Sequence, residues 1–409
     1  MVNIWKKTAI FILSLILFTA LSVSSVIAAD ASDIASDFSD GKKNIICIAH
    51  RGDWHSFPEN SAEAINAAAE YDAVSVDVRL TADGKPVLMA DEKVDRMSVD
   101  GEGKSVSGKV SSFTLAQLKE LYLRESNGGT DKKKTTCRIP ELKEIYETAA
   151  GRTAVMLNVQ ENDFKTVYDY VKALGKLDET VFRINAKPKK IIELTKDLDG
   201  VNVTGNYQGN IIFLATSAVK KYFAANIYTI EMGSTNGNGV LYDNFLMKRF
   251  VGSKRAMVSM VNGRCGKRAD NETGWDDLIS RGYSVIETDF PAELTEYIRK
   301  TETAATDLEK NIDIYANTDL SPYTSETEKA FSSALSAAKK TLDGRSSFSE
   351  LTGARSALQS AHDSLKVGAK KNVALKFRFT PVRIIAVVLC AAAFTGGTLF
   401  LRSKRESTA

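Results

Sequence analysis

Short apolar, strand-like runs alternate with amphipathic helical stretches over most of the chain, and this alternation is the strongest constraint on its fold. The strand-like runs are residues 45–49, 74–80, 154–160, 181–186, 201–204, 227–231, 257–261 and 285–288. The helical stretches are residues 60–71, 115–123, 140–149, 163–174, 188–197, 215–224, 244–250, 275–281 and 292–299. Such repetition predicts either a (β/α)8 barrel or a doubly wound parallel sheet, and periodicity alone does not choose between the two.

The composition changes after residue 301, where Ala, Ser, Lys and Leu dominate. Apolar residues repeat on one helical face in residues 331–342 and again in residues 351–365, and a further helical stretch precedes them. We therefore expect a small three-helix bundle at residues 303–366. The phrase Tyr-Ala-Asn-Thr-Asp-Leu-Ser-Pro-Tyr-Thr at residues 315–324 resembles the modules called FIVAR. Those modules recur in surface proteins of Gram-positive bacteria, as spacers or binding units.

The N-terminal segment has the pattern of a secretory signal peptide. Lys6 and Lys7 precede an uncharged run over residues 8–29, which ends in small residues. A charged start, an apolar centre and a small-residue cleavage site predict a signal peptide at residues 1–29. An uncleaved anchor helix is the alternative interpretation.

The C-terminal segment predicts one membrane span. Residues 384–401 are uncharged and apolar, and a basic tail follows at residues 402–409. As a helix this run rises about 27 Å, close to the ~30 Å of a bilayer core. With the N-terminal signal directing translocation, we expect a single-pass cell-membrane protein with an extracellular domain and a cytoplasmic tail. Cations at residues 366–383 then face anionic lipid head groups or a cell-wall partner.

Composition argues against nucleic-acid binding and against a cysteine metal site. The 409-residue chain is 44% hydrophobic and 26% charged, as is typical of folded protein, and its formal net charge is only +3. Nucleic-acid binding is not expected, because it requires a concentrated basic face. The four cysteines are scattered without metal-ligand spacing. Cys47 and Cys390 lie in apolar runs, and the sequence leaves a Cys137–Cys265 disulfide open.

An ordered set of motifs carries the most specific signal. They are Ala49-His50-Arg51-Gly52, Pro58-Glu59-Asn60-Ser61, the run Val-Asp-Val-Arg-Leu-Thr-Ala-Asp-Gly-Lys-Pro-Val at residues 76–87, Val94-Asp95-Arg96, Ile139-Pro140-Glu141-Leu142 and the run Gly-Tyr-Ser-Val-Ile-Glu-Thr-Asp-Phe-Pro at residues 282–291. This order resembles the glycerophosphodiester phosphodiesterases over residues 45–300. The resemblance implies a (β/α)8 TIM barrel with its site at the carboxyl ends of the strands.

The resemblance also implies which chemical groups the site needs. A divalent cation, Ca²⁺ or Mg²⁺, neutralises the phosphodiester and is held by carboxylates. Two histidines act as general base and general acid, and an arginine holds the phosphate. Family members carry a Glu-x-Asp pair on the second strand, a Glu on the third, and histidines in the His-Arg-Gly motif and in a later His-Asp pair. Here His50 is the expected catalytic histidine and Arg51 the phosphate ligand.

Three of the family's positions differ in this chain. Ser75 replaces the glutamate of the Glu-x-Asp pair, so Asp77 is the remnant of the metal site. Gln160 stands where the third strand carries a metal-binding glutamate, and Ala90 replaces the second histidine. Neutral oxygens bind Mg²⁺ weakly, and losing a general acid or base costs a factor of about 10² to 10⁴ in rate. The sequence therefore predicts a catalytically impaired member of the family.

Three hypotheses for function follow. In the first, the barrel binds a phosphodiester or polyol-phosphate ligand without hydrolysing it, through His50 and Arg51, with Glu59 and His55 as further substrate-binding candidates. In the second, it is an active phosphoric diester hydrolase with a rearranged site, in which His55 replaces the missing histidine or Asp77 with other carboxylates holds a metal. In the third, the barrel is a structural cell-surface domain and the helical module makes the interactions.

Overall fold

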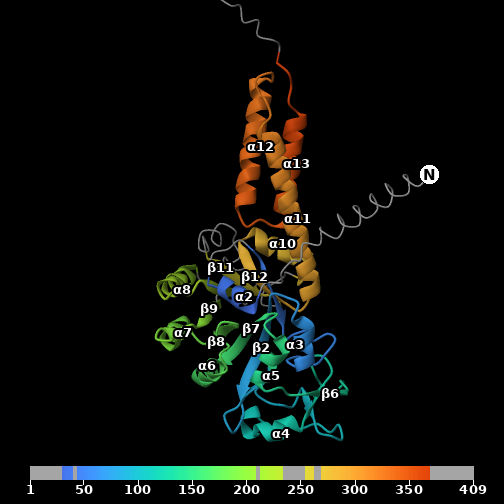
Figure 1. Cartoon of the computed structure of the whole chain (residues 1–409), viewed down its shortest axis with the longest axis vertical. Coiled ribbons are helices and arrows are strands. Elements are labelled where there is room, and N and C mark those ends of the chain that lie inside the picture. The colour runs from blue at the N-terminus through green and yellow to red at the C-terminus, as the bar shows by residue number, and fades with distance from the viewer. Residues whose placement is uncertain (1–29, 40–43, 209–211, 234–253, 262–268, 369–409) are drawn as a thin grey trace, which may run out of the picture. The chain divides into compact units, whose positions relative to one another are not determined.

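A computed structural model describes residues 30–39, 44–208, 212–233, 254–261 and 269–368 (Figure 1). Eight parallel strands form a closed barrel. In chain order they are β1 (Ile46–His50), β2 (Ala73–Leu80), β7 (Ala154–Gln160), β8 (Thr180–Asn185), β9 (Asn202–Gln208), β10 (Thr229–Gly233), β11 (Arg255–Ser259) and β12 (Tyr283–Thr288). Each strand pairs with the next, and β1 pairs with both β12 and β2, which closes the ring. The (β/α)8 barrel prediction is confirmed over the doubly wound sheet.

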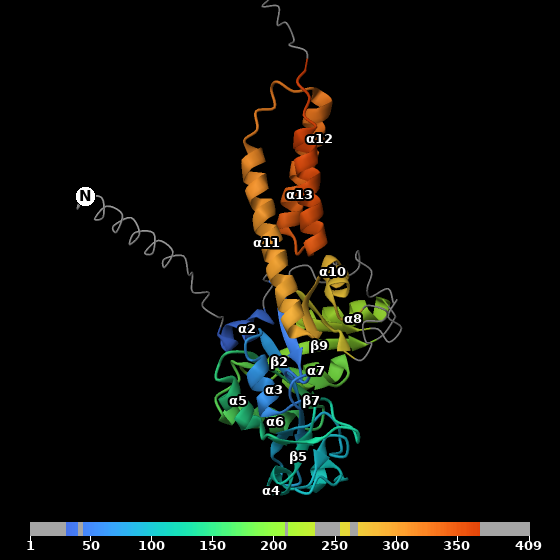
Figure 2. The ribbon, with the colours of Figure 1, turned by 90° about the vertical axis from the view of Figure 1, so that its right-hand side faces the viewer.

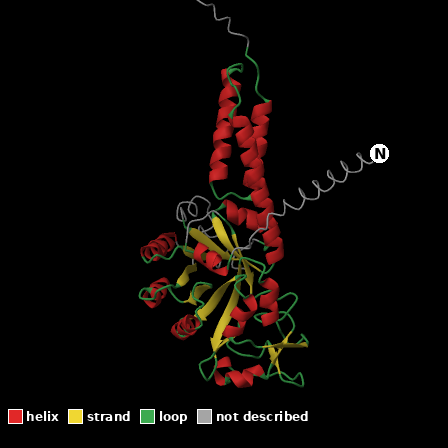
Figure 3. Cartoon of the chain, viewed as in Figure 1, coloured by secondary structure: helices red, strands yellow, loops and turns green. Residues whose placement is uncertain are grey.

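Helices cover the outside of the barrel (Figure 3). They are α3 (Ala62–Ala68), α5 (Leu142–Ala149), α6 (Phe164–Ala173), α7 (Pro188–Thr195), α8 (Ile212–Ala224), α10 (Glu272–Ser280) and the first turns of α11 (Pro291–Ala316). Outward-facing strand residues such as Phe182 pack against helix residues such as Phe164 and Tyr168 in one large apolar core. Because side chains alternate along a strand, the neighbouring residues of each strand face the barrel interior.

The interior of the barrel is layered from apolar to polar. Helix α2 (Ala31–Asp37) and Phe38 pack with Ile46, Ile48 and Met156 in an apolar interior cluster. The next inward-facing position of β1 is His50, which lies at the carboxyl end of its strand. Polar residues therefore gather at that end of the barrel, where the site of a (β/α)8 barrel lies.

A small subdomain is inserted between β2 and α5. It contains β3 (Pro86–Leu88), β4 (Ser98–Val99), η1 (Val110–Ser112), α4 (Leu115–Lys119), β5 (Tyr122–Arg124) and β6 (Lys134–Arg138). Strands β4, β5 and β6 form an antiparallel sheet, and Val94, Leu118 and Leu123 are buried in a separate apolar core. Figure 2 shows this part of the chain around the labels β5 and α4. Strand β3 pairs with β2, which attaches the insertion to the barrel.

Three helices occupy the C-terminal part of the described chain. Helix α11 runs without a break through the expected boundary between residues 300 and 303, and it is followed by α12 (Ser325–Asp343) and α13 (Phe348–Asp363). The ring of Tyr315 stacks on His362 at a centroid distance of 4.2 Å and meets Phe331 edge-on. Residues 319–330 and 364–368 belong to a second compact unit, in which Thr324 donates from its backbone to the Lys366 carbonyl.

Several sequence predictions concern residues outside the described ranges. They are the signal peptide at 1–29, the helix at 244–250, the membrane span at 384–401, the tail at 402–409, Cys265 and Cys390. Within the described ranges, no helix combines the length and apolar character that a bilayer crossing requires. Cys47 and Cys137 are both buried with free thiols.

Candidate functional site

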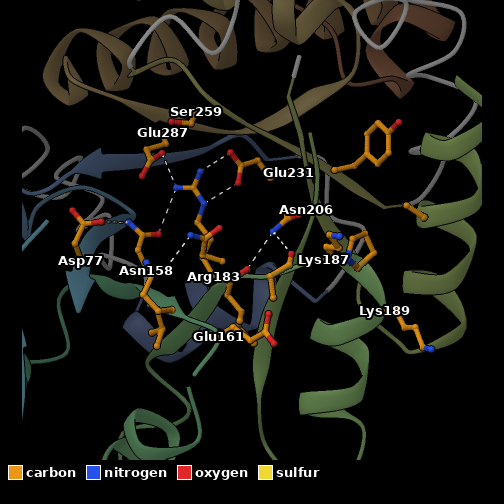
Figure 4. A pocket seen from close by; sticks show the side chains of 18 of the residues that line it. Asp77, Asn158, Glu161, Arg183, Lys187, Lys189, Asn206, Glu231, Ser259 and Glu287 are labelled. Atoms are coloured by element: carbon orange, nitrogen blue, oxygen red, sulfur yellow. Dashed lines mark hydrogen bonds and ion pairs between the residues drawn. The ribbon is translucent and has the colours of Figure 1, made fainter. Parts of the chain in front are cut away.

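A cavity of about 1040 Å³ opens at the carboxyl ends of the barrel strands. Residues from all eight barrel strands line it, together with the start of α7 and one face of α8 (Figure 4). The polar lining includes His50, Arg51, Asp77 and Arg183. The volume is at the upper end of the range for small-molecule sites.

His50 is held in one orientation by a carboxylate. Its Nδ1 lies 2.8 Å from Oδ1 of Asp289, which follows β12, and the Trp54 indole donates to the same oxygen at 2.8 Å. Burial favours the neutral form of Asp289, but its contacts with His50 and Trp54 outweigh burial and lower the pKa of Asp289. Since the carboxylate accepts, Nδ1 is the donor. Nε2 makes no hydrogen bond with a described residue and is the nitrogen left for a ligand.

Arg51 is fixed by its backbone and by two carboxylates. Its φ is 59°, in the left-handed region, and the following Gly52 has φ +80°. Nε donates to Oδ2 of Asp77 at 2.7 Å, and Nη1 donates to Oε2 of Glu59 at 2.9 Å. Asn60 also donates to Asp77, at 3.3 Å. No described residue accepts from Nη2 of Arg51, so this nitrogen is left for a ligand.

Glu59 is buried beneath two guanidinium groups and does not line the cavity. Only 3% of the residue is exposed, and its second oxygen accepts from Nη2 of Arg96 at 2.6 Å. Arg96 comes from the inserted subdomain and also donates to Asp91 at 2.6 Å. Glu59 therefore holds Arg51 in place and ties the insertion to the site. The structure does not place it where it would touch a ligand in the cavity.

His55 lies outside the cavity. Its ring stacks on Trp54 at a centroid distance of 3.9 Å and tilts against Phe290 at 5.1 Å. The side chain is exposed, and it is not among the residues that line the cavity. The structure therefore does not bring His55 and His50 to opposite sides of one ligand.

A group of charged side chains forms the floor of the cavity, and the sequence analysis singled out neither Arg183 nor Glu231 among them. Arg183 donates to both oxygens of Glu231, at 2.5 and 2.8 Å, and to Oε2 of Glu287 at 2.9 Å. Oε1 of Glu287 accepts from the Ser75 hydroxyl at 2.6 Å. Burial opposes ionisation of Glu287, but Arg183 reverses the effect and holds the pKa of Glu287 well below its ordinary value.

Strand alternation was the available signal for these residues. Arg183 and Glu231 each stand in an otherwise apolar strand, in the same inward-facing set as the barrel's interior residues. A charged residue at such a position is either paired or functional. The sequence pattern therefore marks Arg183, Glu231 and Glu287 as interior residues, although it does not show that they meet one another.

A polar site at the carboxyl ends of a (β/α)8 barrel defines the class of protein, and comparison with known proteins gives the family. Residues 50–262 match the model of the glycerophosphoryl diester phosphodiesterase family. A glycerophosphodiester phosphodiesterase of Caldanaerobacter subterraneus subsp. tengcongensis is 34% identical over 260 residues, covering 62% of this chain and 98% of that protein. Mouse glycerophosphodiester phosphodiesterase 1 is 29% identical over 167 residues, covering 37% of this chain and 48% of its own length. The chain belongs to the glycerophosphoryl diester phosphodiesterase family.

Solved structures show the same fold. A glycerophosphoryl diester phosphodiesterase from Parabacteroides distasonis superposes with a TM-score of 0.51 at 19% identity, over 66% of this chain and 91% of that one. A crystal structure from Agrobacterium tumefaciens gives a TM-score of 0.51 at 17% identity, over 64% of this chain and 99% of that one.

Members of this family generally use a divalent metal, and the residues present here do not fit one. The Ser75 hydroxyl donates to Glu287, and the Gln160 side-chain oxygen accepts from Asn185 at 3.1 Å. The Asp77 carboxylate already accepts from Arg51, Asn60 and Asn158. Across the described ranges, no group of three or more His, Cys, Asp or Glu side chains is arranged to hold a metal ion.

The sequence resemblance places the second family histidine at position 90, where the side chain is not a proton donor. Ala90 stands there, and its backbone carbonyl accepts from Nη2 of Arg79 at 2.6 Å. Arg79 thus holds the loop after β3 through the main chain. Of the expected machinery, the structure places His50, Arg51 and Asp77 together at the cavity, with Asp77 bonded to Arg51 rather than free.

Proposed function

We propose that the protein is a surface-displayed member of the family that binds a phosphodiester or polyol phosphate at the barrel mouth and does not hydrolyse it by the metal-dependent route. The observation that carries the proposal is the distribution of unpaired donors. His50 Nε2 and Arg51 Nη2 are left for a ligand, whereas the family's metal positions are neutral or already bonded. Charge-assisted hydrogen bonds from such donors suit a phosphate oxygen.

Unpaired lysines at the cavity wall support an anionic ligand. Lys187, Lys189 and Lys221 line the cavity and are exposed, and none has an ion-pair partner among the described residues. The floor carboxylates and Asp77 are, in contrast, each bonded to a guanidinium group. The excess positive charge therefore lies along the α7 and α8 side of the cavity, where it would attract a polyanion.

Display at the cell surface is the second part of the proposal. The signal pattern at residues 1–29 and the apolar run at 384–401 support secretion with a C-terminal anchor. Helices α11, α12 and α13 provide the amphipathic helices expected of a FIVAR-like three-helix spacer. An anchored barrel would meet lipid head groups or a polyol-phosphate polymer of the cell wall.

Calorimetric titration of the purified protein with a glycerophosphodiester and with a short polyol-phosphate oligomer tests this proposal. Lys221→Glu should weaken binding by about threefold to tenfold, as expected for reversing one exposed charge, and added salt should reduce the difference. Lys220→Glu is the matched control, because Lys220 is the exposed neighbour on α8 that does not line the cavity. Absence of binding below millimolar concentration, or equal losses in the two variants, would contradict the proposal.

The second candidate is an active hydrolase with a rearranged site. The His50–Asp289 pair favours it, because a carboxylate on Nδ1 orients a histidine for proton transfer through Nε2. This function predicts glycerophosphodiester turnover that disappears in His50→Ala. Turnover that survives this substitution would exclude a catalytic role for His50.

A further inference from the structure

The guanidinium group of Arg183 lies at the centre of the carboxylates on the cavity floor (Figure 4). It makes a two-bond contact with Glu231 and a single bond to Glu287, whose side chains are only 4% and 1% exposed. The Arg183 side chain itself is 12% exposed. Burying two carboxylates is unfavourable unless a cation neutralises them, and Arg183 does so here.

The strand register brings Arg183 beside the positions at which the family carries its metal ligands. Asp77 of β2 pairs with Asn158 of β7, and Asn158 pairs with Arg183 of β8. The side chains continue this row. The Asn158 side-chain amide donates to Asp77 at 3.2 Å, and its Oδ1 lies 3.5 Å from Nη1 of Arg183. Arg183 and the Ser75 hydroxyl also donate to the two oxygens of the same carboxylate, that of Glu287.

We infer that Arg183 is the resident cation of this barrel and takes the place of a divalent metal ion. The charges support the substitution. Ser75 and Gln160 contribute no carboxylate at the family's metal positions, while Glu231 and Glu287 contribute two carboxylates from β10 and β12 that Arg183 occupies. The native protein therefore does not need Ca²⁺ or Mg²⁺ at this position, and removal of Arg183 leaves the carboxylates of Glu231 and Glu287 open to an added cation.

The inference does not depend on the proposed ligand, and the first test uses the native protein and metal alone. Titration of the full chain with CaCl₂ or MgCl₂ in a calorimeter should give no binding heat below millimolar concentration, and the melting temperature should be the same in chelator and in metal. Submillimolar binding that is lost in Glu231→Gln would overturn the inference. Either result leaves phosphodiester binding to be judged separately.

The second test removes the guanidinium group. Arg183→Met should lower the melting temperature in chelator by roughly 10 °C, because it leaves buried carboxylates unpaired. Millimolar Ca²⁺ should restore several degrees of this loss. The variant in which Arg183→Met is combined with Glu231→Gln and Glu287→Gln should melt higher in chelator than Arg183→Met and should not respond to Ca²⁺.

Arg124→Met is the matched control. Arg124 is 6% exposed, and it donates to the Lys132 carbonyl and the Ser105 hydroxyl rather than to a carboxylate. Its removal should destabilise the inserted subdomain without creating a response to Ca²⁺. If Arg183→Met gains no more from Ca²⁺ than Arg124→Met, or if the neutral triple variant melts no higher than Arg183→Met, Arg183 is not the resident cation.

Discussion

Gly52 shows how one residue sets the geometry of the His50–Arg51 loop. It lies at φ +80°, and a Cβ there would come within 2.6 Å of the Ala64 backbone on α3. The preceding Arg51 also has a left-handed conformation, and from it the side chain donates to Asp77. A side chain at this position would therefore disturb the site as well as the packing of α3.

Replacement of Gly52 should consequently be severe. Gly52→Ala adds both left-handed strain and a steric clash, and we expect it to reduce the free energy of unfolding by about 3–5 kcal/mol. Gly84→Ala is the control, because Gly84 has φ +71° but open space around its Cβ position. That change should cost only about 1–2 kcal/mol in urea unfolding. Equal costs would show that the approach to Ala64 is not tight.

The ionised carboxylates of the site make stability depend on pH in a defined direction. Their contacts with Arg51, His50 and Arg183 outweigh the effect of burial and lower the pKa values of Asp77, Asp289 and Glu287. In the unfolded chain these groups bind protons near pH 4. The stability that they contribute is therefore present above about pH 5 and is lost as pH falls through the folded-state pKa values.

Urea unfolding between pH 7 and pH 3 tests this dependence. Asp289→Asn removes one of the carboxylates with a lowered pKa and should flatten the loss of stability in acid. Asp163→Asn should have the opposite effect on the slope, because burial raises the pKa of Asp163. If both substitutions change the slope in the same direction, the assigned causes of the pKa shifts are wrong.

At the scale of elements, apolar alternation predicted the barrel strands closely. The run at 154–160 coincides with β7, and the runs at 74–80 and 285–288 fall inside β2 and β12. These strands are buried on both faces, so their apolar signal is continuous and strong. The β4–β5–β6 sheet was missed, because its strands are short and partly exposed and their pairing depends on distant residues.

The same reasoning explains which part of the site was missed. Motifs near the chain's start identified His50, Arg51 and Asp77, and substitution at Ser75 and Gln160 was visible in the sequence. The ion pairs of Arg183 with Glu231 and Glu287 were not visible in the sequence. These residues come from three separate strands and meet only across the barrel. Alternation shows which residues face inward, but only closure of the ring determines which of them touch.

The packing of helix α2 and Phe38 leads to a prediction about the stability of the barrel. Phe38, directly after the helix, is 2% exposed and packs with the apolar interior of the barrel. Phe38→Ala should destabilise the barrel by about 3–5 kcal/mol in urea unfolding. Leu174→Ala is the control, because Leu174 is 38% exposed, and it should cost well under 1 kcal/mol. A small effect of Phe38→Ala would mean that α2 is not part of the stable barrel.

For the whole molecule, the fold is that of the family, but several residues of the site differ from those that the family reaction needs. The fold and the His-Arg-Gly loop are those of the glycerophosphoryl diester phosphodiesterase family. The match to the Caldanaerobacter relative covers 98% of that protein. Ser75, Gln160 and Ala90 stand at three positions where the resemblance implies reactive groups, and the Arg183 guanidinium group pairs with the carboxylates of the cavity floor. This combination is the basis of the binding function proposed above.

Turnover of glycerophosphodiesters by the purified protein is the most direct measurement. The assay compares Mg²⁺, Ca²⁺ and chelator, with His50→Ala as the background and the Caldanaerobacter relative as a reference for the family reaction. We expect no turnover above His50→Ala in any of the three conditions, while the ligand still binds. Metal-dependent turnover that His50→Ala abolishes would show that the site has been rebuilt as an active hydrolase, and would contradict the binding function proposed for it.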